Sequence, residues 1–189
     1  MYFIDEDHIE QKPSYTMADF WPRVGASFID ACILMPIVAV NYLNFFSWKN
    51  VSIFLVATFV QVSYKPIMEF KYGATFGKKI FGLKVIDDST HNINFNQAIL
   101  RSIFSLLSVL ISLSININMF TSNDIMDINT LDELTKYFDN FPVLQLFQSV
   151  LITTTFIDIL FLLFFYDQRK TLHDIISRTK VIYSRKLNF

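Results

Sequence analysis

The class of fold is decided by one apolar stretch near the start of the chain, Arg23-Val24-Gly25-Ala26-Ser27-Phe28-Ile29-Asp30-Ala31-Cys32-Ile33-Leu34-Met35-Pro36-Ile37-Val38-Ala39-Val40. Its length is close to the roughly 20 residues that a helix needs to cross a bilayer. Asp30 lies inside it, and a carboxylate at the centre of a membrane helix costs about 2.5–3.5 kcal/mol on insertion scales. Arg23 precedes Asp30 by seven residues, which is close to two helical turns, so both lie on nearly the same helix face. Asp30 is therefore a candidate functional residue, and Arg23 is its predicted partner.

Four apolar blocks account for most of the hydrophobic residues, which make up 52% of this 189-residue chain. Each block has about the length of a membrane span. None shows the polar stripe with a period of 3.6 residues that marks the surface helices of a soluble protein. We predict an all-α polytopic membrane protein with four transmembrane helices, at about 24–46, 51–70, 102–120 and 143–166.

Basic residues are unevenly distributed although the net charge is only −1. In a four-span arrangement, 14 of the 16 lysines and arginines fall on one side, and only Lys49 and Lys136 fall on the other. Cytoplasmic loops collect basic residues, so both termini are predicted to be cytoplasmic and the protein to be multi-pass in the plasma (inner) membrane. The first residues are acidic and lack the order of a cleavable signal, so the first helix is expected to be an uncleaved anchor.

The predicted outer connections differ in length. Residues 45–50 form a tight turn, with Trp48 in the aromatic belt of the membrane interface. The loop 121–142 is longer, and Thr130 followed by Glu133 has the pattern of a capping box. Apolar residues then recur at helical spacing, which predicts a short amphipathic helix at 131–141 on the outer surface. A plain polar loop is the alternative.

The predicted inner loop after the second block contains three of the chain's four glycines, Gly73, Gly77 and Gly82. Such density indicates backbone with positive φ or a close approach by another element. Gly77-Lys78 resembles the end of a phosphate-binding loop, but the glycine spacing is too short and Lys79 stands where Ser or Thr should follow. Nucleotide binding is therefore not expected. The segment is interpreted as a basic, partly amphipathic stretch on the anionic inner leaflet.

Four blocks of sequence then form an ordered set. They are Pro22-Arg23-Val24-Gly25-Ala26-Ser27-Phe28-Ile29-Asp30, Gly73-Ala74-Thr75-Phe76-Gly77-Lys78-Lys79-Ile80-Phe81-Gly82-Leu83-Lys84-Val85, Gln97-Ala98-Ile99-Leu100-Arg101 and Arg169-Lys170-Thr171-Leu172-His173-Asp174. Together they resemble the RDD family of membrane proteins, which is named for one arginine and two aspartates. The resemblance covers about 18–184, between an N-terminal cytoplasmic segment, 1–17, and a C-terminal tail, 185–189.

The resemblance makes Asp174 the best match for the second aspartate of the family. It implies a membrane protein for which transport of some ligand has been suggested, without naming that ligand. The sequence departs from the family pattern at Ser177-Arg178-Thr179, where small residues are more usual, and in the long outer loop.

Ionisable residues gather at one depth in the four-span arrangement. Asp158 in the last block and Asp30 in the first both lie roughly 10 Å above the inner boundary at a rise of 1.5 Å per residue. Arg23, Lys65, Glu69 and Arg101 lie near the inner ends of their helices. Unpaired charges at such a depth are very costly, so these groups are expected to pair.

Two hypotheses account for this constellation. In the first, the protein transports a small ligand or cation, and Asp30 with Asp158 binds a proton or cation under the influence of Arg23 or Arg101. In the second, the charge pairs only lock the helices in register. Four spans are few for a solute pathway, so a homo-oligomer or a membrane partner is expected beside the lipid bilayer. The alternative function is a non-transporting scaffold or assembly factor whose basic cytoplasmic face binds a partner.

Enzymatic chemistry is not indicated. His173 and Asp174 adjoin each other, but no nucleophile signature accompanies them. The three histidines, His8, His91 and His173, lack zinc-ligand spacing, and the single cysteine forms no cluster. No enzyme activity, cofactor, metal or nucleic-acid partner is expected. Asp174 is predicted to cap a helix or to pair with an inner-loop lysine such as Lys78.

Overall fold

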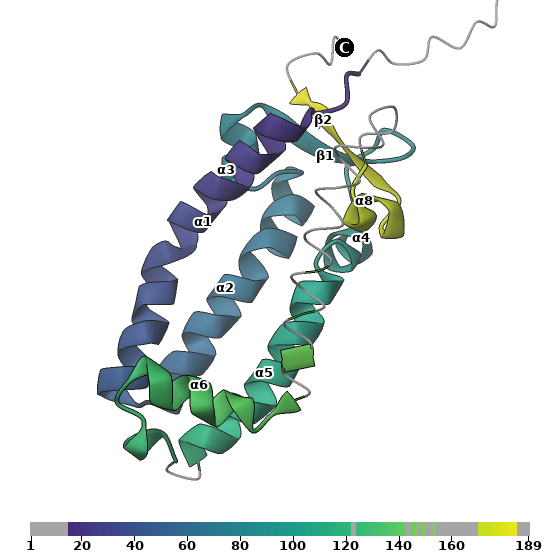
Figure 1. The fold of residues 1–189 in the computed structure, drawn as a ribbon. Helices are drawn as coiled ribbons and strands as arrows, with labels where there is room; N and C mark the ends of the chain where they lie inside the picture. The colour runs from purple at the N-terminus through teal and green to yellow at the C-terminus, as the bar shows by residue number, and fades with distance from the viewer. Residues whose placement is uncertain are drawn as a thin grey trace, which may run out of the picture.

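In the part of the chain that the structure describes, three long helices form the body of the fold, and Figure 1 shows them side by side. The computed structural model describes residues 15–121, 124–142 and 170–184, with the single positions 145, 146, 149 and 153. Helix α1 (Phe20–Leu43) continues into a π-helical turn, η1 (Asn44–Trp48), and is followed by α2 (Val51–Tyr72) and later by α5 (Ile103–Thr121). By length and composition, each of the three is able to cross a membrane.

The described helices match three of the four predicted spans. Their bounds extend the predicted blocks by a few residues at the ends where α1 begins and α2 ends. The predicted fourth span, 143–166, lies outside the described residues except for isolated positions, and Asp158 lies outside them entirely. A count of four spans therefore stays a prediction.

Large apolar side chains point outward from α1 and α2. Phe28, Met35, Val56 and Phe59 are each between 62% and 70% exposed. A soluble protein rarely exposes a contiguous apolar surface of this kind. In a bilayer the same surface faces lipid, and the helices satisfy their own backbone hydrogen bonds. The exposed apolar helices therefore indicate a membrane protein.

The turn between α1 and α2 is fixed by two asparagines. The Asn44 side chain is buried, donates to the Asn50 carbonyl at 2.9 Å and accepts from the Asn50 backbone N–H at 3.0 Å. The Asn50 side chain also caps α2 by accepting from the backbone N–H groups of Ser52 and Ile53. The predicted tight turn is present. The Asn50 side chain satisfies backbone N–H groups at the start of α2 that have no partner within the helix.

One end of the helix bundle bears a small folded unit, which we call the sheet end. It consists of α3 (Phe76–Ile80), β1 (Leu83–Asp87), α4 (Phe95–Leu100), α8 (Leu172–Ile176) and β2 (Thr179–Tyr183). β1 and β2 pair antiparallel, with Leu83 opposite Tyr183 and Val85 opposite Val181. The backbone N–H of Ala18 donates to the Val181 carbonyl at 2.9 Å, so the segment before α1 lies along β2.

The two-stranded sheet corrects the all-α prediction: the fold is mostly helical with a sheet at one end. Leu83, Val85 and Val181 lie in one buried cluster with Ala26 of α1 and Ala98 of α4. Each strand has five residues. The two strands are far apart along the chain and pair only in the folded protein. Within the inner loop, residues 83–87 are therefore a strand that the sequence did not predict.

The opposite end of the bundle carries α6 (Leu131–Asp139), preceded by the short 3₁₀ turn η2 (Asp124–Asp127). Figure 1 shows α6 crossing the bundle at the end away from the sheet. The predicted capping box of Thr130 and Glu133 is present. Leu134 and Tyr137 pack on a buried cluster formed by Met119, Ile125 and Ile128. The short helix is confirmed, and it ends at Asp139 rather than at 141.

The glycines of the inner loop serve the two purposes that their density predicts. Gly73 and Gly82 have φ values of 67° and 64°, which side chains rarely adopt. Gly77 lies where α3 crosses α1, and a Cβ atom there would stand 2.0 Å from the Ala26 carbonyl oxygen. This contact is with backbone, which has no side-chain rotation to relieve it. Only glycine therefore permits the observed approach of α3 to α1.

We expect Gly77→Ala to destabilise the protein by about 1–3 kcal/mol, the usual cost of overpacking. Gly25→Ala is the matched control. Its Cβ would stand 2.4 Å from the Phe81 ring, and Phe81 is 39% exposed and has room to rotate away. The measurement is the midpoint of thermal unfolding of each purified variant in detergent. An equal decrease in both variants would contradict the close approach of α3 to α1.

Candidate functional site

Five charged side chains meet at the sheet end and form what we call the ion cluster: Arg23, Glu69, Lys78, Arg101 and Asp174. Arg23 Nη1 donates to Asp174 Oδ2 at 2.8 Å, and Arg101 Nη1 donates to Asp174 Oδ1. Arg101 Nε donates to Glu69 Oε2 at 2.8 Å, and Lys78 Nζ donates to Glu69 Oε1. The side chains of Glu69 and Asp174 are fully buried. Each carboxylate therefore has two cationic partners.

The sheet end positions these groups through helix ends. Asp174 lies in the first turn of α8, where it completes a capping box with Thr171. Arg101 is the C-terminal cap residue of α4, and α5 begins two residues later at Ile103. Its guanidinium also donates to the Thr179 hydroxyl at the start of β2. The cluster thus joins α1, α2, α3, α4, α8 and β2 through charged and hydrogen-bonded contacts.

Burial and neighbouring charges together set the pKa values of Asp174, Arg101 and Lys78, the members of the ion cluster that lie outside the long helices. Burial alone would raise the pKa of Asp174, but Arg101 and Arg23 hold it well below its usual range. Burial alone would likewise lower the pKa of Arg101, and the carboxylates of Glu69 and Asp174 raise it above its ordinary value. For Lys78 burial prevails over the attraction of Glu69 and lowers the pKa to about 8. At neutral pH the carboxylate of Asp174 and the guanidinium of Arg101 therefore stay charged.

Several predicted pairings need correction. Arg23 pairs with Asp174 and not with Asp30, although both lie on α1. Asp174 caps a helix as expected, but its cationic partners are the two arginines, because Lys78 is on Glu69. The expected clustering of Arg23, Glu69 and Arg101 is present.

Asp30 forms a polar site of its own, and its hydrogen-bond partners are not members of the ion cluster. Its Oδ1 accepts from the Tyr64 hydroxyl at 2.6 Å and from the Gly77 backbone N–H at 2.8 Å. Its Oδ2 accepts from the Thr75 hydroxyl at 2.6 Å. Thr75 is also the N-cap of α3. Both oxygens of Asp30 are therefore used to fasten α3 to α1 and α2.

Sequence patterns missed the partners of Asp30 and one partner of Glu69. Tyr64 and Thr75 carry no charge, and nothing in the local sequence connects them with a residue on another helix. Glu69 was expected to cluster with Arg101, and the folded chain also brings Lys78 to it. Lys78 follows Glu69 by nine residues, which is no helical pair spacing, so the sequence did not predict this contact.

A cavity of about 430 Å³ lies among α1, α2 and α5. Seven of the eleven described residues that line it are polar, although it lies between apolar helices: Asn41, Thr58, Gln61, Lys65, Ser102, Ser105 and Ser112. From Phe54 to Lys65, its wall on α2 runs about 16 Å along the helix axis. Lys65 and Ser102 mark its limit toward the ion cluster, since Ser102 follows Arg101 directly. We call this space the polar cavity.

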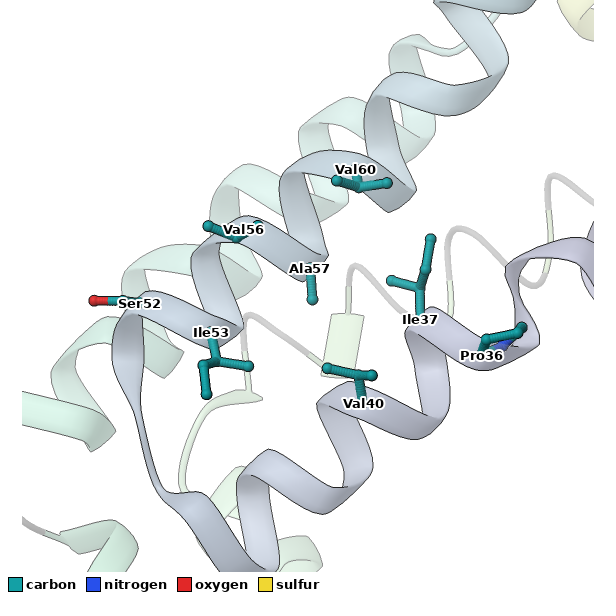
Figure 2. A pocket seen from close by; sticks show the side chains of 8 residues that line it. All are labelled: Pro36, Ile37, Val40, Ser52, Ile53, Val56, Ala57 and Val60. Carbon is teal, nitrogen blue, oxygen red and sulfur yellow. The ribbon is translucent and has the colours of Figure 1, made fainter.

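A second hollow of about 480 Å³ has an apolar lining and lies between α1 and α2. Figure 2 shows Ile53 and Ala57 of α2 facing Ile37 and Val40 of α1 across it. Its position between lipid-exposed helices makes it a groove for apolar groups. Ser52 is the single polar residue among the described residues that line it. Among the described residues, no group of three or more His, Cys, Asp or Glu side chains is arranged to hold a metal ion.

These features define an α-helical membrane protein with a small sheet and a buried ion cluster at one end of its helices. The family model described as the RDD family matches residues 17–178, and the chain belongs to this family. The match covers Arg23, Asp30 and Asp174, the residues that the resemblance assigned to the arginine and aspartates of the name. No curated protein and no solved structure matches the chain.

Acid should weaken the fold through Asp174. Its folded-state pKa is below the ordinary 3.8, so its contribution to stability is complete above that value and is lost as the pH falls through the folded pKa. We expect the thermal midpoint in detergent to fall as the pH decreases from about 5. Asp174→Asn should lower the midpoint at neutral pH, because removing one partner of a buried pair costs about 3–5 kcal/mol, and should make the acid dependence shallower.

Asp88→Asn is the control for this experiment. Asp88 is 49% exposed in its side chain and pairs with Lys170 at 2.7 Å. An exposed pair contributes about 0–1 kcal/mol, so this variant should keep the acid dependence of the wild type. Identical acid dependence in the wild type and in Asp174→Asn would contradict the assigned role of Asp174.

Proposed function

We propose that this RDD-family protein moves a small polar solute across the membrane and that the polar cavity is where the solute binds. The observation that carries this proposal is a polar lining between helices whose outer surfaces are apolar. Polar side chains at membrane depth are costly, and they characteristically line water-filled cavities and solute pathways. The volume of the cavity also falls in the range of about 300–1,000 Å³ that is usual for small-molecule sites.

The contacts of Asp30 favour the structural hypothesis for this residue. A carboxylate that receives three hydrogen bonds from Tyr64, Thr75 and Gly77 has little capacity left for a passing cation. We infer that Asp30 holds α3 in place, and that the solute meets the hydroxyl and amide groups of the cavity. Asp158, the other carboxylate of the transport hypothesis, lies outside the described residues.

The orientation follows from the charge distribution. The sheet end holds most of the basic residues of the described chain, so we propose that it lies on the cytoplasmic side of the plasma (inner) membrane, with both termini inside. A homo-oligomer or a membrane partner is proposed to complete the pathway.

The scaffold hypothesis receives less support. It expects basic residues such as Lys78 on an accessible cytoplasmic face, but the Lys78 side chain is only 12% exposed and its ammonium pairs with Glu69. Lys79 lies 3.8 Å from the centre of the Tyr72 ring, and a cation placed over an aromatic face already has a favourable contact. Neither lysine is free for a protein partner in this arrangement.

Water access to the polar cavity tests the proposal. In a Cys32→Ser background, which removes the single cysteine, Thr58→Cys should react with a membrane-impermeant thiol reagent added to reconstituted vesicles. Phe59→Cys is the matched control, because Phe59 is 69% exposed on the outer surface of α2 and would face lipid. No reaction at position 58, or equal reaction at both positions, would contradict a water-filled cavity.

Solute flux in proteoliposomes tests whether the protein transports a solute, in addition to admitting water to the polar cavity. Vesicles containing the wild type should release one of four probes, sodium, potassium, acetate or inorganic phosphate, faster than protein-free vesicles. Thr58→Trp should reduce this release to the background by filling the cavity, whereas Phe59→Trp should leave it unchanged. Release at the background rate for all four probes would overturn the transport proposal even if position 58 reacts.

Substitution of Asp30 separates its structural role from a role in transport. Asp30→Asn keeps an oxygen that accepts from Tyr64 and Gly77, so we expect membrane abundance and flux close to those of the wild type. Asp30→Ala removes all three acceptor contacts and should lower abundance several-fold, as judged by quantitative immunoblotting of membranes. Normal abundance of Asp30→Asn with lost flux would instead assign this carboxylate to the solute pathway.

A further inference from the structure

The polar cavity carries a positive charge at its end near the ion cluster. Lys65 is the one ionised side chain among the described residues that line the cavity. No hydrogen bond or ion pair joins its ammonium group to another residue of the described chain. Glu69 is close enough to interact with it electrostatically, but both oxygens of that carboxylate are occupied by Arg101 and Lys78. Among the described residues, Lys65 is therefore a cation lining the cavity without a direct anionic partner.

A hydrogen-bond donor lies at the same end of the cavity. Ser102 is only 3% exposed, and its hydroxyl has no hydrogen-bond partner in the described part of the chain. Ser102 lies in the turn between α4 and α5 and lines the cavity. Buried polar groups are nearly always satisfied, so among the described residues this hydroxyl is a donor available to a molecule in the cavity.

Neutral polar groups continue the wall from this end. Thr58 and Gln61 lie on α2 within two turns of Lys65, and Ser105 lies in the first turn of α5, just after Ser102. Hydroxyl and amide groups donate to oxygen atoms, and an ammonium group favours a negative charge among them. A cation entering here would meet Lys65 without a carboxylate among the described lining residues. The combination selects against cations and for oxyanions.

We propose that the polar cavity binds a small soluble oxyanion, a carboxylate or an inorganic phosphate, with Lys65 as its charge partner and Ser102 as a donor to its oxygen. This inference rests on the proposed function and names the class of its solute. It also differs from the cation hypothesis drawn from the sequence, because the ionised group that faces the cavity is a lysine.

The charge at the cavity is measured by the rate at which an introduced thiol there reacts. In the Cys32→Ser background, Ser105→Cys should react faster with an anionic methanethiosulfonate reagent than with a cationic one. Lys65→Gln should shift the ratio of the two rates by roughly 25-fold, since one unit charge about 4 Å away in water changes each rate about fivefold, in opposite directions for the two reagents. Lys65→Arg should keep the ratio. Lys71→Gln, on the same helix outside the cavity, is the control and should also keep it.

Occupancy is measured by protection. Sodium acetate and sodium phosphate, used separately in phosphatidylcholine vesicles, should slow the reaction of the Ser105→Cys variant with a neutral reagent, both when Lys65 is intact and in combination with Lys65→Arg. Neither salt should protect when Lys65→Gln is added, and Ser102→Ala should require several-fold more salt. The salt that protects at the lower concentration distinguishes a carboxylate from a phosphate ligand.

Three results would overturn the inference. They are a faster reaction with the cationic reagent, a rate ratio that is unchanged in Lys65→Gln, and an absence of protection by both salts. Protection that appears only when phosphatidylglycerol is added to the vesicles would identify the ligand as a lipid headgroup and not as a soluble anion. Each of these results requires that the thiol introduced at position 105 reacts with water-borne reagents, so the oxyanion proposal fails while the water-filled cavity stands. Failure of the cavity itself shows as no reaction at either position 58 or position 105.

Discussion

The carboxylate of Asp174 between Arg23 and Arg101 is the interaction on which the rest of the structure depends. It connects the first turn of α1 with the α4–α5 junction and with α8, which are far apart along the chain. A buried carboxylate that loses a partner leaves a charge without compensation, so separating any of the three segments from the others would be costly. α8 leads directly into β2, and β2 pairs with β1. The ion pairs of Asp174 fix α8, and α8 in turn positions β2 beside β1.

A second constraint is the close approach of α3 to α1. Gly77 brings its backbone against the Ala26 carbonyl, and Asp30 accepts a hydrogen bond from the Gly77 N–H. A side chain on Gly77 would prevent the approach, and without an acceptor the N–H would be left unsatisfied. The costly carboxylate in the first span is thus explained by the loop that it holds. Its position on α1 places α3 so that Lys78 reaches Glu69.

The charged groups at the inner ends of the helices have different roles: some form the ion cluster, and Lys65 lines the polar cavity. Arg101 and Lys78 occupy the oxygens of Glu69, which leaves Lys65, one turn earlier on α2, to face the polar cavity. A cluster that served only to lock the helices would not require a separate cation in a polar-lined space. The proposed transport and the proposed anion selectivity both follow from this separation. The lock maintains the shape of the cavity, and the cavity supplies the groups that would meet a solute.

The sequence by itself determined the membrane class, three of the helices, the capping box of Thr130 and Glu133 and the special backbone at Gly73, Gly77 and Gly82. Each depends on local physics: apolar length, helix-end hydrogen bonding or the conformational freedom of glycine. The sequence also supported the membership of the RDD family. Only the tertiary structure decided that Arg23 meets Asp174, that Asp30 meets Thr75 and that residues 83–87 and 179–183 form a sheet. Such contacts join distant segments, and the charge or strand pattern of either segment fits several partners until the folded backbone leaves one within reach.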